Sequence, residues 1–282
     1  MTPHTLTLFD SETVEITTFR ATDTAATPVI IFFPAMGVRA AFYQPLGKEM
    51  SAAGIHFISA DLRGLGTSSV RPSKQKDFGY KEMIEDVDTI IQHVKNQFPN
   101  EKLYLMGHSL GGQLASLYLG KHPKAADGLI LVAACSIYYK GWQGGQKWKI
   151  LMGIRLFPIL SQLFGYFPGD KVGFGGTGAK TVMLDWGQVG KTGRYTIAND
   201  AFNYEKGMQH TKLPIFAASI EKDWMAPKLA IQNLYKKFHP EAPVTDYELS
   251  KEATGVSLNH FNWVKNSALL VTAIEKWLTK IR

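Results

Sequence analysis

Short, continuously apolar runs alternate with longer amphipathic segments along most of this chain. Residues 29–33 and 128–133 are apolar throughout and residues 55–60 largely so, which is typical of strands covered on both faces. The segments between them place apolar residues three and four positions apart, the spacing of a helix that buries one face. Strands that alternate with helices at these intervals predict an α/β fold with a mostly parallel, doubly wound sheet. Further strands are expected over 103–106 and 213–220, and helices over 42–53, 80–96, 113–121 and 228–238.

The two ends of the chain complete this pattern. Residues 5–9 and 14–20 alternate apolar with polar positions, so we expect a half-buried hairpin at a sheet edge. Residues 245–249 read as the last strand, and residues 261–281 as a closing amphipathic helix.

The alternation stops after Ala134. Residues 135–212 are rich in tryptophan, tyrosine and glycine, and no buried strand run interrupts them. A connection of this length is too long for a compact domain, so we expect a core of residues 1–134 and 213–282 with a cap or lid insert at 135–212. Within this insert, residues 147–164 could form an amphipathic helix. Its apolar side chains would face a substrate or simply extend the packing.

A glycine-rich turn, Gly107-His108-Ser109-Leu110-Gly111-Gly112, lies between a predicted strand and a predicted helix. A serine in the pattern G-x-S-x-G at such a junction is typical of a nucleophile elbow. The glycines two positions from Ser109 leave room for the tight turn, and the following helix directs its first N–H groups at the serine. Ser109 is therefore the candidate nucleophile.

A serine needs a general base, and the base needs an orienting carboxylate. His260 follows the last strand and can reach back over Ser109. Asp223 directly follows a buried strand and is the candidate acid, with Asp246 and Glu221 as rivals. The remaining histidines of the strands and helices fit the base position less well, namely His56, His93, His108, His122, His210 and His239.

Two backbone N–H groups could hold the negative charge that forms on an attacked carbonyl oxygen. One belongs to Leu110, directly after the candidate nucleophile, and the other to Met36, in the loop after the strand at 29–33. The stretch Asp61-Leu62-Arg63-Gly64 reads instead as a structural turn held by charges.

Composition narrows the class of protein. With 282 residues, 45% of them hydrophobic, the chain can bury a large core. The net charge is +7, but the lysines are scattered, so nucleic-acid binding is disfavoured. The only cysteine, Cys135, excludes an internal disulfide and a cysteine metal site, and we expect no cofactor or metal. Neither a secretory signal nor a membrane-spanning run is recognisable, so we expect a soluble cytoplasmic protein; peripheral contact with membranes stays open.

These motifs together resemble the α/β-hydrolase superfamily. Pro34-Ala35-Met36-Gly37 is similar to its H-G-x-G loop, residues 61–68 to its D-x-R-G-x-G-x-S turn, and residues 107–112 to its elbow. The chain most resembles the serine-aminopeptidase and monoacylglycerol-lipase-like branch, including predicted hydrolases without an assigned substrate. It departs from the pattern at Pro34-Ala35, at Ile220 and at Asn259, but keeps every reacting group.

The residues and the resemblance both imply a serine hydrolase that cleaves carboxylic esters. Ser109, His260 and Asp223 would form the triad, with Met36 and Leu110 as the oxyanion hole. The aromatic insert favours a hydrophobic acyl ester or a monoacylglycerol as the small-molecule substrate, with Trp142, Trp148 and Trp186 as candidate lining residues. Peptidase, amidase or acyltransferase action on the same triad stays open, as does a non-catalytic binding protein.

Overall fold

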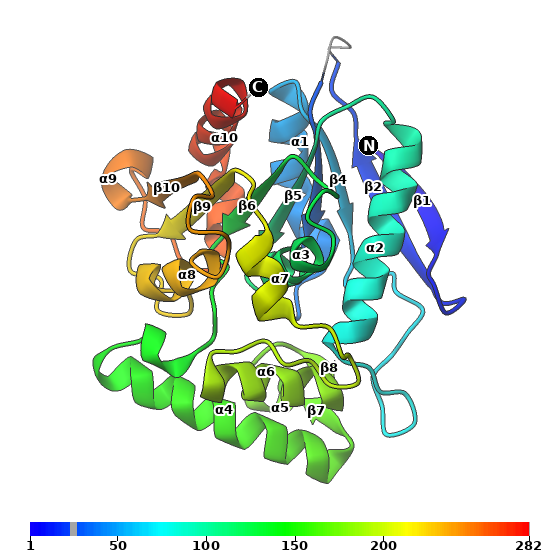
Figure 1. The fold of residues 1–282 in the computed structure, drawn as a ribbon, viewed down its shortest axis with the longest axis vertical. Coiled ribbons are helices and arrows are strands. Elements are labelled where there is room, and N and C mark those ends of the chain that lie inside the picture. Colours follow the sequence, from blue (N-terminus) through cyan, green and yellow to red (C-terminus); the bar gives the residue numbers. More distant parts are fainter. Residues whose placement is uncertain (23–26, 282) are drawn as a thin grey trace.

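A large, strongly twisted sheet forms the centre of the molecule (Figure 1). The computed structural model describes residues 1–22 and 27–281, and within them the strands lie in the order β1-β2-β4-β3-β5-β6-β9-β10. The first two strands pair antiparallel and the other six run parallel. Their bounds are Thr2–Thr7 (β1), Thr13–Phe19 (β2), Val29–Phe33 (β3), His56–Ala60 (β4), Leu103–His108 (β5), Gly128–Val132 (β6), Ile215–Ile220 (β9) and Val244–Leu249 (β10).

The burial of each strand agrees with its place in the sheet. Every residue of β3, β5, β6 and β9 is buried, as expected of inner strands covered on both faces, whereas β1 at one edge is mostly exposed. The predicted α/β fold, with its mostly parallel sheet and its edge hairpin, is confirmed.

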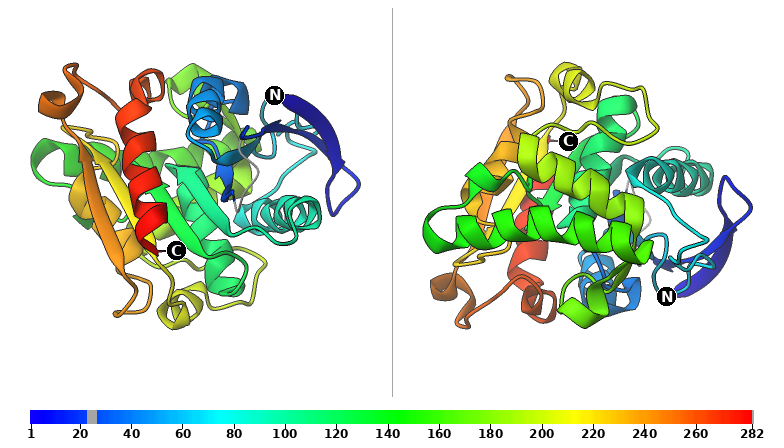
Figure 2. Two further views of the ribbon diagram at one scale, coloured as in Figure 1. Left: turned by 90° about the horizontal axis from the view of Figure 1, so that it is seen from above. Right: turned by 90° about the horizontal axis from the view of Figure 1, so that it is seen from below.

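Helices cover both faces of the sheet. Helices α1 (Gln44–Ala52) and α10 (Ala268–Ile281) pack together on one face, and α2 (Tyr80–Gln97) and α3 (Leu110–Lys121) pack together on the other (Figure 2). Helix α8 (Lys228–Tyr235) follows β9, and the one-turn helix α9 (Lys251–Thr254) follows β10.

The structure differs from the predicted helices at two places. The first helix is preceded by a 3₁₀ turn, η1 (Ala40–Tyr43). The closing helix is divided into a 3₁₀ turn, η3 (Asn262–Asn266), and α10, with Ser267 between them. The Ser267 hydroxyl lies 3.2 Å from the Val264 carbonyl oxygen, a local bond that competes with a continuous helix.

The insert covers the carboxyl ends of the parallel strands. Its elements α4 (Gly144–Phe164), β7 (Tyr166–Pro168), α5 (Gly169–Val172), β8 (Thr177–Ala179) and α6 (Lys180–Thr192) form one layer, which we call the cap layer (Figure 1, bottom). The short turn η2 (Tyr139–Gly141) leads into it. Strands of three residues are too short for a recognisable sequence pattern. Helix α7 (Tyr204–His210) packs against α3 of the core.

The cap layer is anchored to the core through α6. The buried Asp185 carboxylate accepts the N–H groups of Tyr80 (3.0 Å) and Ala198 (2.8 Å). Burial raises the pKa of Asp185 to about 6, although these two N–H groups act against the shift. Beside it, the Thr181 N–H donates to Asp77 at 3.0 Å. Helix α4 lies on the far side of α6 and forms the outer surface of the layer.

Candidate active site

Ser109 occupies a sharp turn between the central strand β5 and helix α3. Its φ of 52° and ψ of −116° are strained for a residue with a side chain. A Cβ atom at Gly107 would lie 2.2 Å from the Gly112 nitrogen, and one at Gly111 would lie 2.0 Å from the Phe33 carbonyl oxygen. Both glycines are therefore required by close backbone approach, and they hold Ser109 at the start of α3.

His260 and Asp223 form a buried pair. His260 Nδ1 lies 2.7 Å from Asp223 Oδ2, and their side chains are only 5% and 1% exposed. The other carboxylate oxygen of Asp223 accepts the Met225 N–H at 2.9 Å. Because Asp223 directly follows β9 and contacts Nδ1, the Nε2 atom of His260 is the nitrogen left for a reacting group.

Two asparagines shape the loop around His260. The Asn259 side chain accepts the N–H groups of Phe261 and Asn262, each at 2.9 Å. The Asn262 side chain in turn accepts the Asn259 N–H at 2.6 Å. Asn259, a departure from the family pattern, therefore braces the turn that carries the histidine.

A cavity of about 60 Å³ joins the predicted reacting groups. Its wall includes Ser109, His260, Met36 and Leu110, and Asp223 lies behind the histidine. The remaining wall is mostly apolar and comes from the core and the cap layer: Gln113, Cys135, Ile137, Trp142, Ile150, Phe174, Trp186, Trp224 and Met225.

The three predicted tryptophans have different surroundings. Trp142 and Trp186 line the cavity and are almost fully buried. The Trp142 ring nitrogen donates to the Trp224 carbonyl oxygen at 2.7 Å. Trp148 is 69% exposed and does not line the cavity, because it faces outward from α4.

Sequence reasoning missed two cavity residues with distinct chemistry. Trp224 follows Asp223 at the end of β9, a position that could have drawn attention to it. The Gln113 side-chain oxygen accepts the hydroxyl groups of Tyr80 and Tyr195, each at 3.3 Å. These three residues come from α2, α3 and the insert, so no local pattern could bring them together.

His108 is buried beside the pair rather than facing the cavity. The Ala35 N–H donates to the Tyr43 oxygen at 3.2 Å, which leaves the Tyr43 hydroxyl proton for His108 Nδ1 at 2.7 Å. Burial, helped by the nearby His260, holds the pKa of His108 well below its usual range. His108 is therefore neutral and links the Met36 loop to the nucleophile turn.

The turn at residues 61–68 is held by buried charges. Asp61 accepts the N–H groups of Ala40 (2.6 Å) and Thr67 (2.9 Å). Arg63 pairs with Asp10 at 2.8 Å and with Asp86 at 2.6 Å. Asp61 has its partners in backbone N–H groups, and Arg63 has its partners in two carboxylates. These contacts agree with a structural role for the turn.

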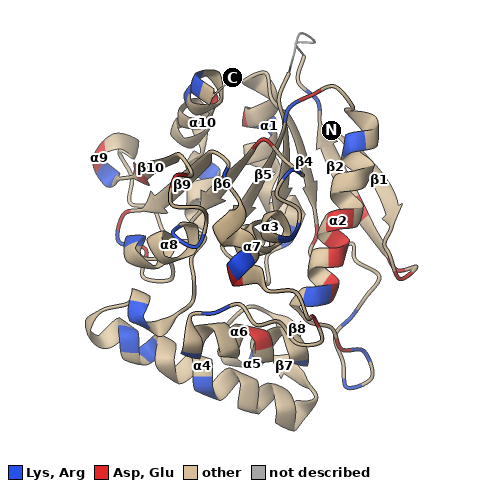
Figure 3. Ribbon diagram, in the orientation of Figure 1, with Lys and Arg blue, Asp and Glu red and all other residues tan. Residues whose placement is uncertain are grey.

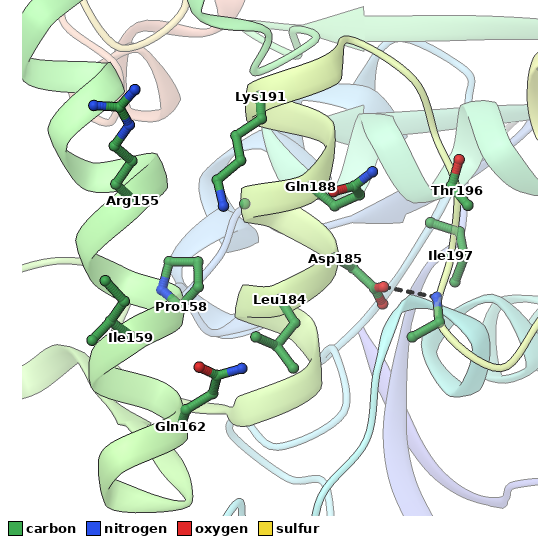
Figure 4. A pocket seen from close by; sticks show the side chains of 12 residues that line it. Arg155, Pro158, Ile159, Gln162, Leu184, Asp185, Gln188, Lys191, Thr196 and Ile197 are labelled. Carbon is green, nitrogen blue, oxygen red and sulfur yellow. Dashed lines mark hydrogen bonds between the residues drawn. The ribbon is translucent and has the colours of Figure 1, made fainter.

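A hollow larger than the active-site cavity lies elsewhere. It measures about 640 Å³ and lies between α4, α6 and residues 196–198 (Figure 4). Its wall holds no serine, cysteine or histidine, so it offers neither a serine–histidine nor a cysteine–histidine pair. Among the described residues, no three His, Cys, Asp or Glu side chains converge as metal ligands would.

Comparison with known proteins identifies a family, whose model covers the segment around the elbow. The family model described as "Serine aminopeptidase, S33" matches residues 24–166, just over half of the chain. The chain belongs to this family. It is 33% identical over 108 residues to "AB hydrolase superfamily protein YisY" of Bacillus subtilis and 26% identical over 109 residues to a monoacylglycerol lipase of Mycolicibacterium smegmatis. These alignments cover 38% and 39% of the chain, and 38% of each relative.

The whole chain also resembles solved structures. Mouse alpha/beta hydrolase domain-containing protein 10 superimposes with a TM-score of 0.68 over 100% of both chains, at 16% identity. At this identity the likeness concerns the fold. The described residues of this S33 family member therefore have the α/β-hydrolase fold.

Proposed function

We propose that this protein is a serine hydrolase of carboxylic esters. One observation carries the proposal: Ser109, strained at the nucleophile elbow, shares a cavity with His260, whose other ring nitrogen lies 2.7 Å from Asp223. This arrangement, with the chain order Ser, Asp, His, supplies nucleophile, base and orienting acid.

The reaction would proceed in two halves. Ser109 Oγ attacks the acyl carbon while His260 Nε2 takes the hydroxyl proton, and Asp223 stabilises the resulting imidazolium. The N–H groups of Met36 and Leu110 are proposed to bind the oxyanion; the Leu110 N–H, at the first position of α3, has no partner within the helix. The oxyanion collapses, the alcohol leaves with the proton of His260, and water then releases the acid by the same steps.

The cavity wall favours an ester over the free amino terminus of a peptide. An aminopeptidase must bind the ammonium group of its substrate, which calls for a carboxylate or a set of acceptors. The residues that line this cavity include no aspartate or glutamate, whereas Trp142, Trp186 and Trp224 offer apolar surface. A medium-length acyl chain or a monoacylglycerol suits such a wall.

The size of the cavity implies that the cap layer moves. Sites for small molecules usually measure about 300–1,000 Å³, and about 60 Å³ holds only one or two waters. Ile150 of α4 and the half-exposed Trp224 form part of this wall. We infer that α4 shifts away from Trp224 when substrate enters.

Ester turnover tests the proposal. The native protein should hydrolyse p-nitrophenyl esters and monoacylglycerols, and Ser109→Ala should lower kcat by about 10⁴-fold or more. Ser136→Ala is a matched control, because the Ser136 hydroxyl is buried without a hydrogen-bond partner. Faster cleavage of amino-acid p-nitroanilides than of every ester would favour the aminopeptidase alternative. Equal ester turnover by native protein and Ser109→Ala would refute the proposed mechanism.

A further inference from the structure

The outer face of α4 carries a row of exposed apolar side chains. These are Trp148 (69% exposed), Met152 (63%), Leu156 (44%), Ile159 (51%) and Leu163 (74%), which we call the α4 stripe. At 100° per residue the five side chains fall within an arc of about 80°, and at 1.5 Å per residue they extend over about 22 Å. Exposed apolar surface this continuous marks an interaction site.

The opposite face of the same helix packs against the rest of the protein. Ile154, Pro158 and Ser161 are buried against the rest of the cap layer, and Ile150 lines the active-site cavity. Helix α4 is therefore apolar on two sides, one of which packs inward while the other faces solvent. The apolar side chains of the α4 stripe do not pack in the core, so folding of the described residues does not explain them.

Positive charge surrounds the stripe. Lys147, Lys149 and Arg155 lie on α4, which has no aspartate or glutamate (Figure 3). Residues 135–192 carry seven lysines and arginines against two aspartates, so they hold five of the chain's seven net positive charges. One of these aspartates, Asp185, is buried and hydrogen-bonded, and the other, Asp170, accepts the Thr177 hydroxyl.

The neighbouring groove adds cations at the same surface. Arg155 of α4 and Lys191 of α6 lie at one end of the 640 Å³ hollow, with Gln162 at the other (Figure 4). Its lining also includes Ile159 of the stripe, so apolar and cationic groups occur side by side.

We propose that this face of the cap layer docks the protein on the surface of an anionic lipid bilayer. The α4 stripe would lie at the level of the upper acyl chains, while Lys147, Lys149 and Arg155 meet lipid phosphates. A second copy of the chain is a poorer occupant, because two such faces would oppose like charges. No helix within the described residues is long and apolar enough to cross a membrane.

The proposal goes beyond ester hydrolysis and does not depend on it, because docking involves neither Ser109 nor His260. It also gives the cap layer a role in delivering acyl chains to the active-site cavity. Helix α4 carries the stripe on one face and a cavity residue, Ile150, on another. Docking would hold the movable wall of the cavity against a source of acyl chains.

Vesicle sedimentation tests the docking surface with the full chain. The native protein should sediment with vesicles of phosphatidylcholine and phosphatidylglycerol, and more weakly with phosphatidylcholine alone. Met152→Ser/Leu163→Ser should lower the partition coefficient by about tenfold or more, since it removes two apolar contacts. Lys147→Gln/Lys149→Gln/Arg155→Gln should remove most of the preference for anionic vesicles, by about fivefold for each charge.

Leu269→Ser is the matched control, because Leu269 is 39% exposed on α10, a helix of the core outside the cap layer. It should sediment like the native protein. Trp148 reports the contact directly: its fluorescence should shift to the blue on binding, and Trp148→Phe should remove this shift. Circular dichroism and ester turnover in solution check that each variant is folded.

Three results would overturn the proposal. In the first, the native protein stays in solution with anionic vesicles; in the second, Met152→Ser/Leu163→Ser binds as well as Leu269→Ser. Alternatively, light scattering might reveal a dimer that Met152→Ser/Leu163→Ser converts to a monomer, in which case the stripe is an interface between copies. Ester hydrolysis by Ser109 would be untouched by any of these results.

Discussion

The 2.7 Å contact between Asp223 and His260 determines which ring nitrogen of the histidine is available. In Asp223→Asn the amide can present its N–H₂ group to Nδ1, which stabilises the wrong tautomer of His260. We expect kcat for ester hydrolysis to fall by about 10³- to 10⁴-fold, with KM nearly unchanged. Steady-state kinetics on a p-nitrophenyl ester measures both values.

Asp246→Asn serves as the control for this substitution. The Asp246 carboxylate accepts the Tyr235 hydroxyl at 3.1 Å, on the strand next to the one that precedes Asp223. Its replacement should leave kcat within about twofold, because it has no contact with His260. An equal loss of activity in the two variants would contradict the assignment of the acid.

His108 makes folding sensitive to pH. Burial depresses its pKa in the folded protein, so below the unfolded value of about 6.5 the unfolded state binds a proton that the folded state does not. The free energy of unfolding should therefore fall as the pH drops below that value, by up to about 1.4 kcal/mol per pH unit from this residue. Urea unfolding of native protein and His108→Asn at several pH values checks this.

The outcome depends on the difference between the two proteins. The other histidines are present in both proteins, so only the difference in slope reports on His108. The native protein should lose stability more steeply than His108→Asn as the pH falls from 7 to 5. Parallel slopes would show that His108 is not held neutral in the folded state.

Single residues were predictable where a backbone constraint surrounds them. The tight turn at Ser109 could be predicted because it requires Gly107 and Gly111. The Tyr43–His108 contact and the cavity positions of Gln113 and Trp224 could not, because they join segments that are distant in sequence. Side-chain direction, which also turns Trp148 away from the cavity, is not encoded by local spacing.

At the scale of elements, the elbow requires that α3 approach β3 closely. In Gly111→Ala the new Cβ would lie 2.0 Å from the Phe33 carbonyl oxygen, which the backbone cannot avoid without a shift of the strand or the helix. We expect a loss of about 3 kcal/mol or more in the free energy of unfolding, together with loss of activity. Urea denaturation measures the first effect and ester turnover the second.

Gly145→Ala is the matched control for Gly111→Ala, because it lies in a helix with space for an added Cβ atom. A Cβ atom at Gly145 would meet nothing within 4 Å, and alanine is the better helix former. This variant should be as stable as the native protein or slightly more so. Equal destabilisation by the two substitutions would mean that the close approach of α3 to β3 is not tight.

Elements were predictable where the apolar pattern has one clear period. The buried strands β3 and β6 and the one-sided helix α2 correspond closely to the expected ranges. The break at Ser267 and the three-residue strands β7 and β8 depend on single hydrogen bonds and short pairings, which a window of many residues averages out. Helix α4, apolar on two sides, gives no clear period and so does not reveal which side faces solvent.

At the scale of the whole molecule, Asp185 connects the cap layer to the core. Asp185→Ala would leave the buried N–H groups of Tyr80 and Ala198 without an acceptor, at a cost of about 1–3 kcal/mol each. We expect residues 135–212 to be cleaved faster in this variant than in the native protein. Within the variant, the core should be cleaved more slowly than residues 135–212. Limited proteolysis followed by mass spectrometry locates the cuts.

Asp170→Ala provides the matched substitution within the cap layer. Asp170 contacts only the neighbouring Thr177 hydroxyl among the hydrogen bonds of the described residues, and it is exposed. Its variant should resist proteolysis like the native protein. Cleavage spread evenly over the core and residues 135–212 in Asp185→Ala would show that the two parts unfold together.

The central claim is that Ser109 is activated by His260. Labelling with a fluorophosphonate probe tests it most directly, since the probe bonds covalently to an activated serine. The account predicts labelling of the native protein on the peptide that contains Ser109, and none in Ser109→Ala or His260→Ala. Labelling of Ser109→Ala at the native rate, or no labelling of the folded native protein by short-chain and long-chain probes alike, would contradict it.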